Sequence, residues 1–324
     1  MVCSWRELSQ QVESEVATFD FSGKPNELYD PIGYTMTLGG KRIRPTLCLL
    51  SAQLFGGDLS RAMNLAMAVE VFHNFTLVHD DIMDDAPIRR GKPAVHAKWN
   101  RDIAILSGDV MFVQAYQLLA KGNSERLSQI LSVFNQTAIE VCEGQQFDMN
   151  FETLNNVTVE AYIEMIRLKT AVLLACSLQL GAFESGASDQ NAALIYEFGE
   201  KIGIAFQIQD DFLDCYANPE DFGKRVGGDI ISNKKTFLLL TAYEKADPSQ
   251  TDRLNLLMES SGSDEEKVNK VLEIYNELSI PKLTKAAMQT YFEQGMKALS
   301  QIPAATTLKQ PLIDLAEMLM NRKH

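Results

Sequence analysis

An acidic pattern, Asp-Asp-x-x-Asp, occurs twice in this chain of 324 residues, each time within a strongly apolar stretch with helical periodicity. On a helix, the first and fifth residues of the pattern lie on the same face, one turn apart. Asp80 with Asp84, and Asp210 with Asp214, would therefore each form a pair of carboxylates. Crowded carboxylates in apolar surroundings need a compensating cation, and Mg²⁺ is the natural candidate because it prefers oxygen ligands and substrate phosphates. The two patterns together predict a magnesium-dependent site for a phosphorylated substrate.

Most acidic runs are solvent-exposed helix faces, and that interpretation has to be weighed here. The residues beside both patterns are nevertheless strongly apolar, among them Phe72, Val78 and Ile82 for the first and Ile204, Ile208 and Phe212 for the second. Because uncompensated buried charge is costly, three carboxylates in a mostly buried helix are candidates for function.

Basic residues follow in the neighbouring segments. They are Lys41-Arg42-Ile43-Arg44 behind Gly39-Gly40, Arg89-Arg90-Gly91-Lys92, Gly223-Lys224-Arg225 and Lys234-Lys235. Arginine binds phosphate through two parallel hydrogen bonds, and lysine serves as a point charge. For Arg42 and Lys235 an ordinary surface position is an equally good interpretation. The others recur beside the acidic patterns, which favours a role in binding phosphate.

Composition and charge narrow the class of protein. The net charge of −13 and the estimated pI of 4.9 argue against a nucleic acid or an anionic membrane surface as partner. Five scattered cysteines without a Cys-x-x-Cys pair are typical of reduced structural residues. The polar start of the chain and its short apolar runs predict no targeting segment and no integral membrane segment. We therefore expect a cytoplasmic protein.

Helical periodicity extends over nearly the whole sequence. Apolar residues recur three and four positions apart in 59–85, 98–121, 125–152, 157–182, 189–217, 232–246, 264–277, 282–301 and 307–321. Gly and Pro signals separate these segments, but none of the breaks is long enough for an interdomain linker. The pattern predicts a single all-α domain over 1–324, with both carboxylate pairs near helix ends, basic loops after them and a cleft between the two helices.

Several separated motifs carry a resemblance to a known family. They are Gly39-Gly40-Lys41-Arg42-Ile43-Arg44-Pro45, the two acidic patterns, Arg89-Arg90-Gly91, Gly144-Gln145-Gln146-Phe147-Asp148, Lys169-Thr170, and the run from Gly223-Lys224 through Gly228-Asp229 to Asn233-Lys234-Lys235-Thr236. In this order, from about residue 30 to 240, they resemble the trans-isoprenyl diphosphate synthases of the polyprenyl synthetase family. The remaining C-terminal third adds only helices of suitable length.

The resemblance implies an isoprenoid synthase helical bundle around a deep central cavity, working as a homodimer. Its implied activity is the head-to-tail condensation of isopentenyl diphosphate with an allylic diphosphate in isoprenoid biosynthesis. About three Mg²⁺ ions per active site are implied as cofactors. Magnesium and cationic side chains would stabilise the departing diphosphate, and a closed apolar cavity would keep water from the allylic cation.

The resemblance also implies roles for individual residues. Metal ions would be held by Asp80, Asp84, Asp210 and Asp214. Cationic contacts to the allylic diphosphate would come from Arg89, Lys169, Lys224 and Lys234. Isopentenyl diphosphate would be held by Lys41, Arg44, His73 and Arg90. Thr170 and Gln207, with the backbone around Lys169, would face the developing cation.

Phe75 is the residue that the resemblance links to product length. It lies five positions before Asp80, where family members direct side chains down the tunnel that receives the growing chain. A bulky ring there would act as a floor and favours a short product, farnesyl or geranylgeranyl diphosphate. The small Thr76 and the absence of the two-residue insertion seen in bacterial farnesyl synthases favour geranylgeranyl diphosphate. Phe75 as ordinary core packing is the alternative.

Other classes of protein share parts of these patterns. Glu70-x-x-His73 matches half of a di-iron motif, but the sequence has no second Glu-x-x-His. A terpene cyclase would usually replace the second aspartate motif and lack the bases for isopentenyl diphosphate. A noncatalytic subunit of a heteromeric prenyl synthase would be expected to lack a carboxylate pair or a catalytic lysine. The cyclase and the noncatalytic subunit stay as alternatives to the synthase.

Overall fold

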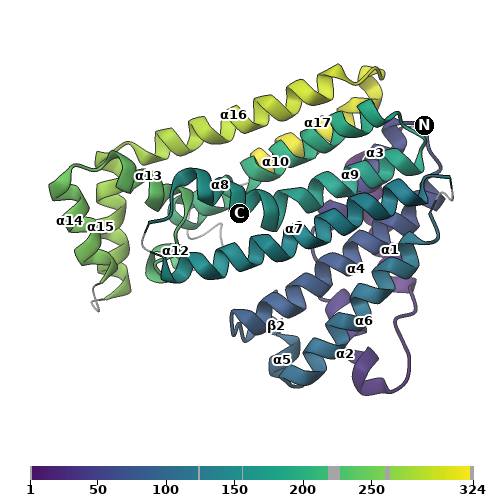
Figure 1. The fold of residues 1–324 in the computed structure, drawn as a ribbon, viewed down its shortest axis with the longest axis horizontal. Helices are drawn as coiled ribbons and strands as arrows, with labels where there is room; N and C mark the ends of the chain where they lie inside the picture. The colour runs from purple at the N-terminus through teal and green to yellow at the C-terminus, as the bar shows by residue number, and fades with distance from the viewer. Residues whose placement is uncertain (1, 123–124, 155, 218–226, 260–262, 322–324) are drawn as a thin grey trace. The chain divides into compact units, whose positions relative to one another are not determined.

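The computed structural model describes residues 2–122, 125–154, 156–217, 227–259 and 263–321, and these residues are almost entirely helical (Figure 1). Their helices are α1 (Trp5–Thr18), α2 (Asn26–Met36), α3 (Ile43–Leu54), α4 (Leu59–Met83), α5 (Val95–Lys98), α6 (Arg101–Leu119), α7 (Leu127–Thr153), α8 (Val159–Ile166), the π-helical η1 (Arg167–Ala171), α9 (Val172–Glu184), α10 (Asp189–Tyr216), α12 (Gly228–Ile231), α13 (Phe237–Lys245), α14 (Pro248–Met258), α15 (Asp264–Glu277), α16 (Ile280–Gln301) and α17 (Thr306–Met320). An antiparallel hairpin of β1 (Ile88–Arg89) and β2 (Lys92–Pro93) follows α4. The predicted all-α class is confirmed.

Contacts within the chain define two compact units. The first comprises 1–135, 176–196 and 302–312, and the second comprises 136–175, 197–301 and 313–324. Four of the boundaries fall inside helices, in α7, α9, α10 and α17, rather than in linkers. The single domain over 1–324 stays a prediction, and each unit is described by itself below.

In the first unit, α4 is the central helix and packs against α3 and α6. Aliphatic residues of α4 such as Leu65, Val69 and Val71 are fully buried, which explains why this 25-residue helix is apolar around most of its circumference. Asp58 caps its N-terminus by accepting a hydrogen bond from the Ser60 backbone N–H at 2.9 Å. The burial of α4 holds its C-terminal turn, and with it the first acidic motif, in a defined position.

In the second unit, an apolar cluster surrounds the C-terminal half of α10. Its buried members are Phe151, Tyr162, Met165, Ile166, Ala171, Ile204, Ile208, Phe237, Leu240 and Met288. A neighbouring cluster includes Cys215, Leu239, Val271 and Tyr275 and joins α13 to α15. Together these clusters position the second acidic motif.

A π-helical turn interrupts the helical run between α8 and α9. At Gly144 of α7, a Cβ atom would lie 2.2 Å from the Lys169 backbone nitrogen and 2.6 Å from its Cα. Glycine therefore allows α7 to lie directly against the backbone of this turn. The helical segment expected over 157–182 is observed as α8, η1 and α9, which follow one another without a break from Val159 to Glu184.

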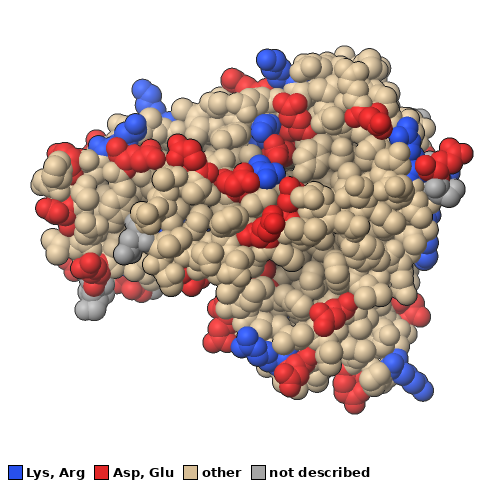
Figure 2. Space-filling model, viewed as in Figure 1, with Lys and Arg blue, Asp and Glu red and all other residues tan. Residues whose placement is uncertain are grey.

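The stretch Val159–Glu184 is long and apolar enough to cross a membrane, but 78% of its most apolar window is buried. Such burial is what a core helix of a soluble protein shows. All five cysteines are free, and Cys48, Cys176 and Cys215 are buried. On the face drawn in Figure 2, the basic side chains of the described residues are dispersed among acidic ones and form no broad patch.

We expect Gly144→Ala to lower the free energy of unfolding by about 3 kcal/mol or more, because the added methyl group meets backbone atoms that side-chain rotation cannot move away. Gly33→Ala in the interior of α2 is the matched control. An added Cβ there has no neighbour within 4 Å, so we expect stabilisation of up to about 1 kcal/mol. Urea denaturation measures both, and an equal effect of the two substitutions would contradict the close approach.

Candidate active site

The first acidic motif forms the C-terminal turn of α4. Asp84 is the C-cap residue, and its N–H donates to the Asp80 carbonyl at 2.8 Å, so these two residues are one helical turn apart as predicted. The middle residue, Asp81, is buried and accepts hydrogen bonds from Nε of Arg89 at 2.9 and 3.2 Å, with a further contact from Nη2. Asp81 therefore pairs with a protein cation, while Asp84 is exposed and Asp80 is partly exposed.

Without a bound cation, the negative charge of this helical turn destabilises the folded protein. The C-terminal end of a helix carries partial negative charge, so acidic residues there are disfavoured and cations are favoured. Asp80 and Asp84 add negative charge to that end of α4. A divalent cation at this position would offset both the partial negative charge of the helix end and the charge of the two carboxylates.

Three of the predicted residues for isopentenyl diphosphate lie together in the first unit. Arg44 Nη1 lies 3.1 Å from Nε2 of His73, and Arg90 Nη1 donates to the Gly39 carbonyl. Because guanidinium only donates hydrogen bonds, His73 accepts through Nε2 and carries its proton on Nδ1. Lys41 is exposed between Gly40 and Arg42.

The electrostatics of this cluster are those of an anion site. Burial, followed by the charge of Arg44 and then of Arg90, lowers the pKa of His73 well below its usual value, so the ring is neutral at pH 7. Burial lowers the pKa of Arg44 to about 10, with Arg90 adding to the effect against the opposing charge of Glu70. Because Arg90 lowers the pKa of Arg44, these two cations gain from a shared anion, and a diphosphate fits that requirement.

The hairpin after the first motif presents Arg89 and Arg90 at a tight turn. Arg90 has φ of 51° and Gly91 has φ of 74°, as a two-residue type I′ turn requires. A positive φ is strained for arginine. The hairpin therefore directs Arg89 towards Asp81 and Arg90 towards Gly39 at some cost in backbone energy.

The second acidic motif lies in the last two turns of α10. Its middle residue, Asp211, is buried and accepts hydrogen bonds from the Tyr162 hydroxyl and, at 3.3 Å, from the Phe237 backbone N–H. Burial raises the pKa of Asp211 to about 7, against the opposing effect of Lys234. Asp210 is exposed and Asp214 is partly buried. The middle aspartate again has partners within the protein.

A further carboxylate, Asp229 at the start of α12, lies beside this motif. Its backbone N–H donates to Oδ2 of Asp214 at 2.9 Å. Burial raises the pKa of Asp229 to about 6, and Asp214 and Asp210 raise it further against the effect of Lys234. Burial also raises the pKa of Asp214. Burial is thus the main cause of both raised pKa values, and neighbouring carboxylates add to it.

Lys234 brings a cationic side chain to this acidic group. Its Nζ lies 4.0 Å from Oδ1 of Asp229. Burial opposes its charge, but the surrounding carboxylates outweigh burial and raise the pKa of Lys234. These carboxylates are Asp229, Asp211, Asp148 and Asp210. Lys224, predicted to act with Lys234, lies outside the described residues.

The predicted residues of the η1 turn also have partners in the second unit. Lys169 Nζ donates to Oδ2 of Asp148 at 2.5 Å, and the Thr170 hydroxyl donates to Oε1 of Gln207 at 3.4 Å. Thr170 and Gln207, which the resemblance assigns to the developing cation, are thus neighbours. The π-helical turn widens the backbone at Lys169 and Thr170, a distortion that is frequent at functional sites.

Phe75 belongs to an aromatic cluster on α4 and α6. Its ring centroid lies 5.2 Å from that of Phe112 in a stacked arrangement, 4.7 Å from His79 and 5.6 Å from Phe72. Stacking of this kind stabilises a ring in one orientation. Phe75 is only partly buried, so one part of its ring is not covered by this cluster.

The donor set fits magnesium. Within the described ranges, no group of three or more His, Cys, Asp or Glu side chains has the geometry of a protein-enclosed metal site. Magnesium is typically held by one or two carboxylates, with waters and substrate phosphates completing its shell. The exposed and partly exposed carboxylates at the ends of α4 and α10 offer hard oxygen donors of the kind that magnesium prefers.

Comparison with known proteins identifies the family. The family model described as polyprenyl synthetase matches residues 25–275. A short chain isoprenyl diphosphate synthase of Methanothermobacter thermautotrophicus is 37% identical and covers 98% of both chains. A geranylgeranyl diphosphate synthase of Methanosarcina mazei is 38% identical over 93% of this chain and 91% of its own. A crystal structure of a geranylgeranyl pyrophosphate synthase superposes with a TM-score of 0.94 at 41% identity over the full length of both chains.

The chain belongs to the polyprenyl synthetase family. This membership confirms the predicted prenyltransferase class and the isoprenoid synthase fold. A more distant structure, of a geranylgeranyl pyrophosphate synthase of Corynebacterium glutamicum, matches with a TM-score of 0.82 at 26% identity over 98% of this chain and 97% of that one. That enzyme was crystallised with isoprenyl diphosphate and magnesium.

Sequence reasoning missed four residues of these clusters: Asp81, Asp211, Tyr162 and Asp229. The first two have a signal in the motif itself, because the second aspartate is one position, or about 100°, around the helix from the first. That rotation directs it away from the carboxylate pair and towards the core. The partners of these aspartates lie far along the chain, and only the structure shows which side chains reach them.

We expect Asp84→Asn to stabilise the magnesium-free protein by about 0.5 kcal/mol, because it removes a charge from the negative end of α4. The same substitution should lower kcat at least about 100-fold if this carboxylate binds a catalytic metal. Thermal unfolding in chelator and steady-state kinetics measure the two effects. Glu265→Gln in the first turn of α15 is the control of opposite sign, since a carboxylate favours that helix end. Unchanged activity in Asp84→Asn would remove Asp84 from the metal site.

Proposed function

We propose that this protein condenses isopentenyl diphosphate with an allylic diphosphate, head to tail, and that geranylgeranyl diphosphate is its main product. Two observations carry the proposal: the first unit holds an anion site and an acidic helix end, and the second unit holds another acidic helix end. Arg44, His73 and Arg90 suit a diphosphate, and the exposed carboxylates at the two helix ends suit hard cations. Family membership supports the reaction class, and the names of the relatives support a short product.

We assign the residues to two substrates. Lys41, Arg44, His73 and Arg90 bind isopentenyl diphosphate. Neutral His73 accepts from Arg44 through Nε2, which leaves its Nδ1 proton for donation to the substrate. Asp80, Asp84, Asp210 and Asp214 hold about three magnesium ions against the allylic diphosphate. Arg89, Lys169, Lys224 and Lys234 add positive charge to the same diphosphate. Bound magnesium would supply neutralisation of the charge that develops on the leaving group.

The chain's own groups would then direct the chemistry. Lys169 and Lys234 stabilise the departing diphosphate because both bring positive charge to the acidic group of the second unit, Lys169 beside Asp148 and Lys234 4.0 Å from Asp229. The Thr170 hydroxyl, the Gln207 amide oxygen and the widened backbone of η1 direct partial negative charge towards the allylic carbon. Attack by the alkene forms the new carbon–carbon bond, and loss of a proton to the released diphosphate restores the double bond.

Two further parts of the proposal concern assembly and location. Ile105, Leu106 and Val113 of α6 are 38%, 56% and 56% exposed, which favours a homodimer that covers this helix face. A monomer mass by light scattering at assay concentration would contradict the dimer. The enzyme is proposed to work in the cytoplasm, which cell fractionation tests.

Incubation with isopentenyl diphosphate, magnesium and each of dimethylallyl, geranyl and farnesyl diphosphate tests the function. We expect geranylgeraniol as the main alcohol after dephosphorylation, identified by mass spectrometry, and no product with excess chelator. No elongation from any primer by folded protein would overturn the synthase and favour a noncatalytic subunit. Cyclic products from an allylic diphosphate alone would favour a terpene cyclase.

Phe75→Ala is expected to lengthen the main product by one or more five-carbon units, because it removes the ring proposed as the floor of the product tunnel. Phe55→Ala is the matched control, since Phe55 is a similarly half-buried phenylalanine of the same unit outside the aromatic cluster. Chromatography of the alcohols measures both. An unchanged product length with Phe75→Ala would contradict the floor role and leave Phe75 as a core packing residue.

A further inference from the structure

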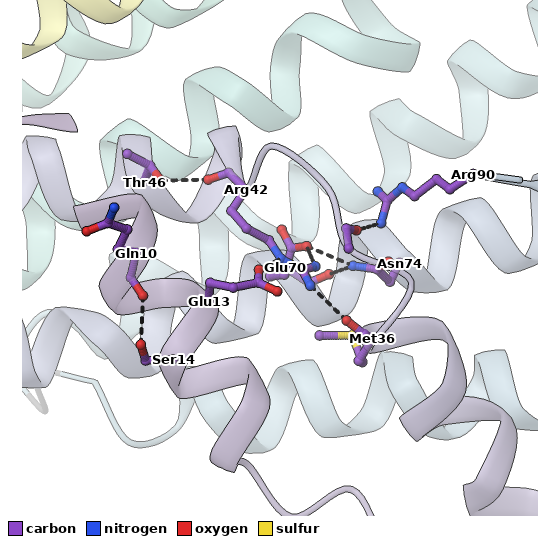
Figure 3. Close-up of polar contacts among 10 residues, drawn as sticks. Gln10, Glu13, Ser14, Met36, Arg42, Thr46, Glu70, Asn74 and Arg90 are labelled. Atoms are coloured by element: carbon purple, nitrogen blue, oxygen red, sulfur yellow. Dashed lines mark hydrogen bonds and ion pairs between the residues drawn. The ribbon is translucent and has the colours of Figure 1, made fainter. Parts of the chain in front are cut away.

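Arg42 lies between two predicted ligands of isopentenyl diphosphate, Lys41 and Arg44, but its own side chain points into the protein (Figure 3). The side chain is 1% exposed. This contradicts the ordinary surface position that the sequence left open for Arg42. The residue also has a positive φ of 45° at the N-cap of α3, which is strained for arginine. A strained, buried cation inside a binding loop requires an explanation.

Every guanidinium nitrogen of Arg42 has a partner. Nε donates to Oε2 of Glu13 at 2.7 Å, Nη1 donates to Oε1 of Glu70 at 2.5 Å, and Nη2 donates to the Met36 carbonyl at 2.8 Å (Figure 3). Its backbone carbonyl accepts from the backbone N–H of Thr46 at 3.1 Å and from the Thr46 hydroxyl at 2.7 Å. The loop before α3 is thereby tied to α1, to the end of α2 and to α4.

Glu70 connects this network to the anion site. It is 2% exposed and lies on α4 three residues, nearly one turn, before His73. Its Oε1 also accepts a hydrogen bond from Nδ2 of Asn74 at 3.0 Å. The arrangement sets the position of the loop relative to the helix that carries His73. Glu70 also supplies negative charge close to Arg44 and Arg90.

We propose that Arg42, through its buried ion pair with Glu70, is a positioning residue for isopentenyl diphosphate. The pair holds the Gly39–Arg44 loop against α4, so that Lys41 and Arg44 face the same phosphate groups as His73. Arg42 does not itself contact the substrate. The inference rests on the proposed function, because it assigns isopentenyl diphosphate to this cluster.

The choice of variants follows from the burial of the pair. Removing one partner leaves an unpaired buried charge and endangers folding, whereas replacing both with apolar residues of similar volume is often tolerated. The test therefore uses the double variant Arg42→Met with Glu70→Met. Arg42→Lys is the second variant, because lysine keeps the charge but cannot bridge Glu13, Glu70 and the Met36 carbonyl at once. Arg253→Gln is the control, since it breaks an ion pair to half-exposed Glu277 that involves no predicted site residue.

KM for each substrate, kcat and the unfolding midpoint are measured for all variants. For the double variant we expect KM for isopentenyl diphosphate to rise about tenfold, the change that loss of about 1.4 kcal/mol of binding gives. KM for the allylic diphosphate should stay within about twofold. Arg42→Lys should show a smaller rise of the same selectivity, and the control should show none. An equal rise in both KM values, or an unchanged KM for isopentenyl diphosphate, would overturn the positioning role.

Direct binding separates this inference from the proposed function. Calorimetric titration of isopentenyl diphosphate without magnesium reports on the cluster whether or not the protein catalyses condensation. If the wild-type protein elongates no primer but binds isopentenyl diphosphate, and Arg42→Lys binds it more weakly, the proposed function fails and the positioning role holds. If the wild-type protein elongates primers and all variants bind isopentenyl diphosphate equally, the positioning role fails alone.

Discussion

A buried charge needs a partner, and this requirement organises both candidate binding regions. Each acidic motif places three carboxylates within two turns at the C-terminal end of an apolar helix, where the backbone itself adds negative charge. In each motif the middle carboxylate is buried and has a partner within its own unit. Asp81 pairs with Arg89, and Asp211 receives hydrogen bonds from the Tyr162 hydroxyl and the Phe237 N–H. Of the outer carboxylates, Asp84 and Asp210 are exposed and Asp80 and Asp214 are partly exposed, so metal ions and substrate can reach them.

The basic region around Arg42 and Arg44 also contains buried charges that need partners, but here the charges are positive. Arg42 and Arg44 are two residues apart, yet only Arg42 is fully compensated by carboxylates. Arg44 pairs with neutral His73, which accepts a hydrogen bond but supplies no negative charge. Four of the five non-glycine residues with positive φ in the described part of the chain lie in the loops that carry these groups: Arg42, Asp85, Arg90 and Asn233. Backbone strain is concentrated where side-chain direction matters for binding.

The sequence predicts the helices best where packing against one face decides the structure. The expected segment 264–277 coincides with α15, and 189–217 differs from α10 by one residue. Periodicity did not predict the η1 turn, because that distortion depends on the close approach of Gly144, far along the chain from it. The hairpin of β1 and β2 was also missed, since strands of two residues contain no alternating pattern.

The motifs alone predict that the outer aspartates lie at helix ends. They do not show which arginine of the segment Lys41-Arg42-Ile43-Arg44 is buried. The role of Arg42 depends on Glu13 and Glu70, which the sequence separates by 57 positions.

The central claim is that the outer aspartates bind metal ions while the middle aspartates bind partners within the protein. A crystal structure with magnesium, isopentenyl diphosphate and an unreactive allylic diphosphate analogue tests it most directly. We expect metal ions on Asp80, Asp84, Asp210 and Asp214, with Asp81 still on Arg89 and Asp211 still on Tyr162. Coordination of a metal ion by Asp81 or Asp211, or an allylic diphosphate bound without metal, would contradict it.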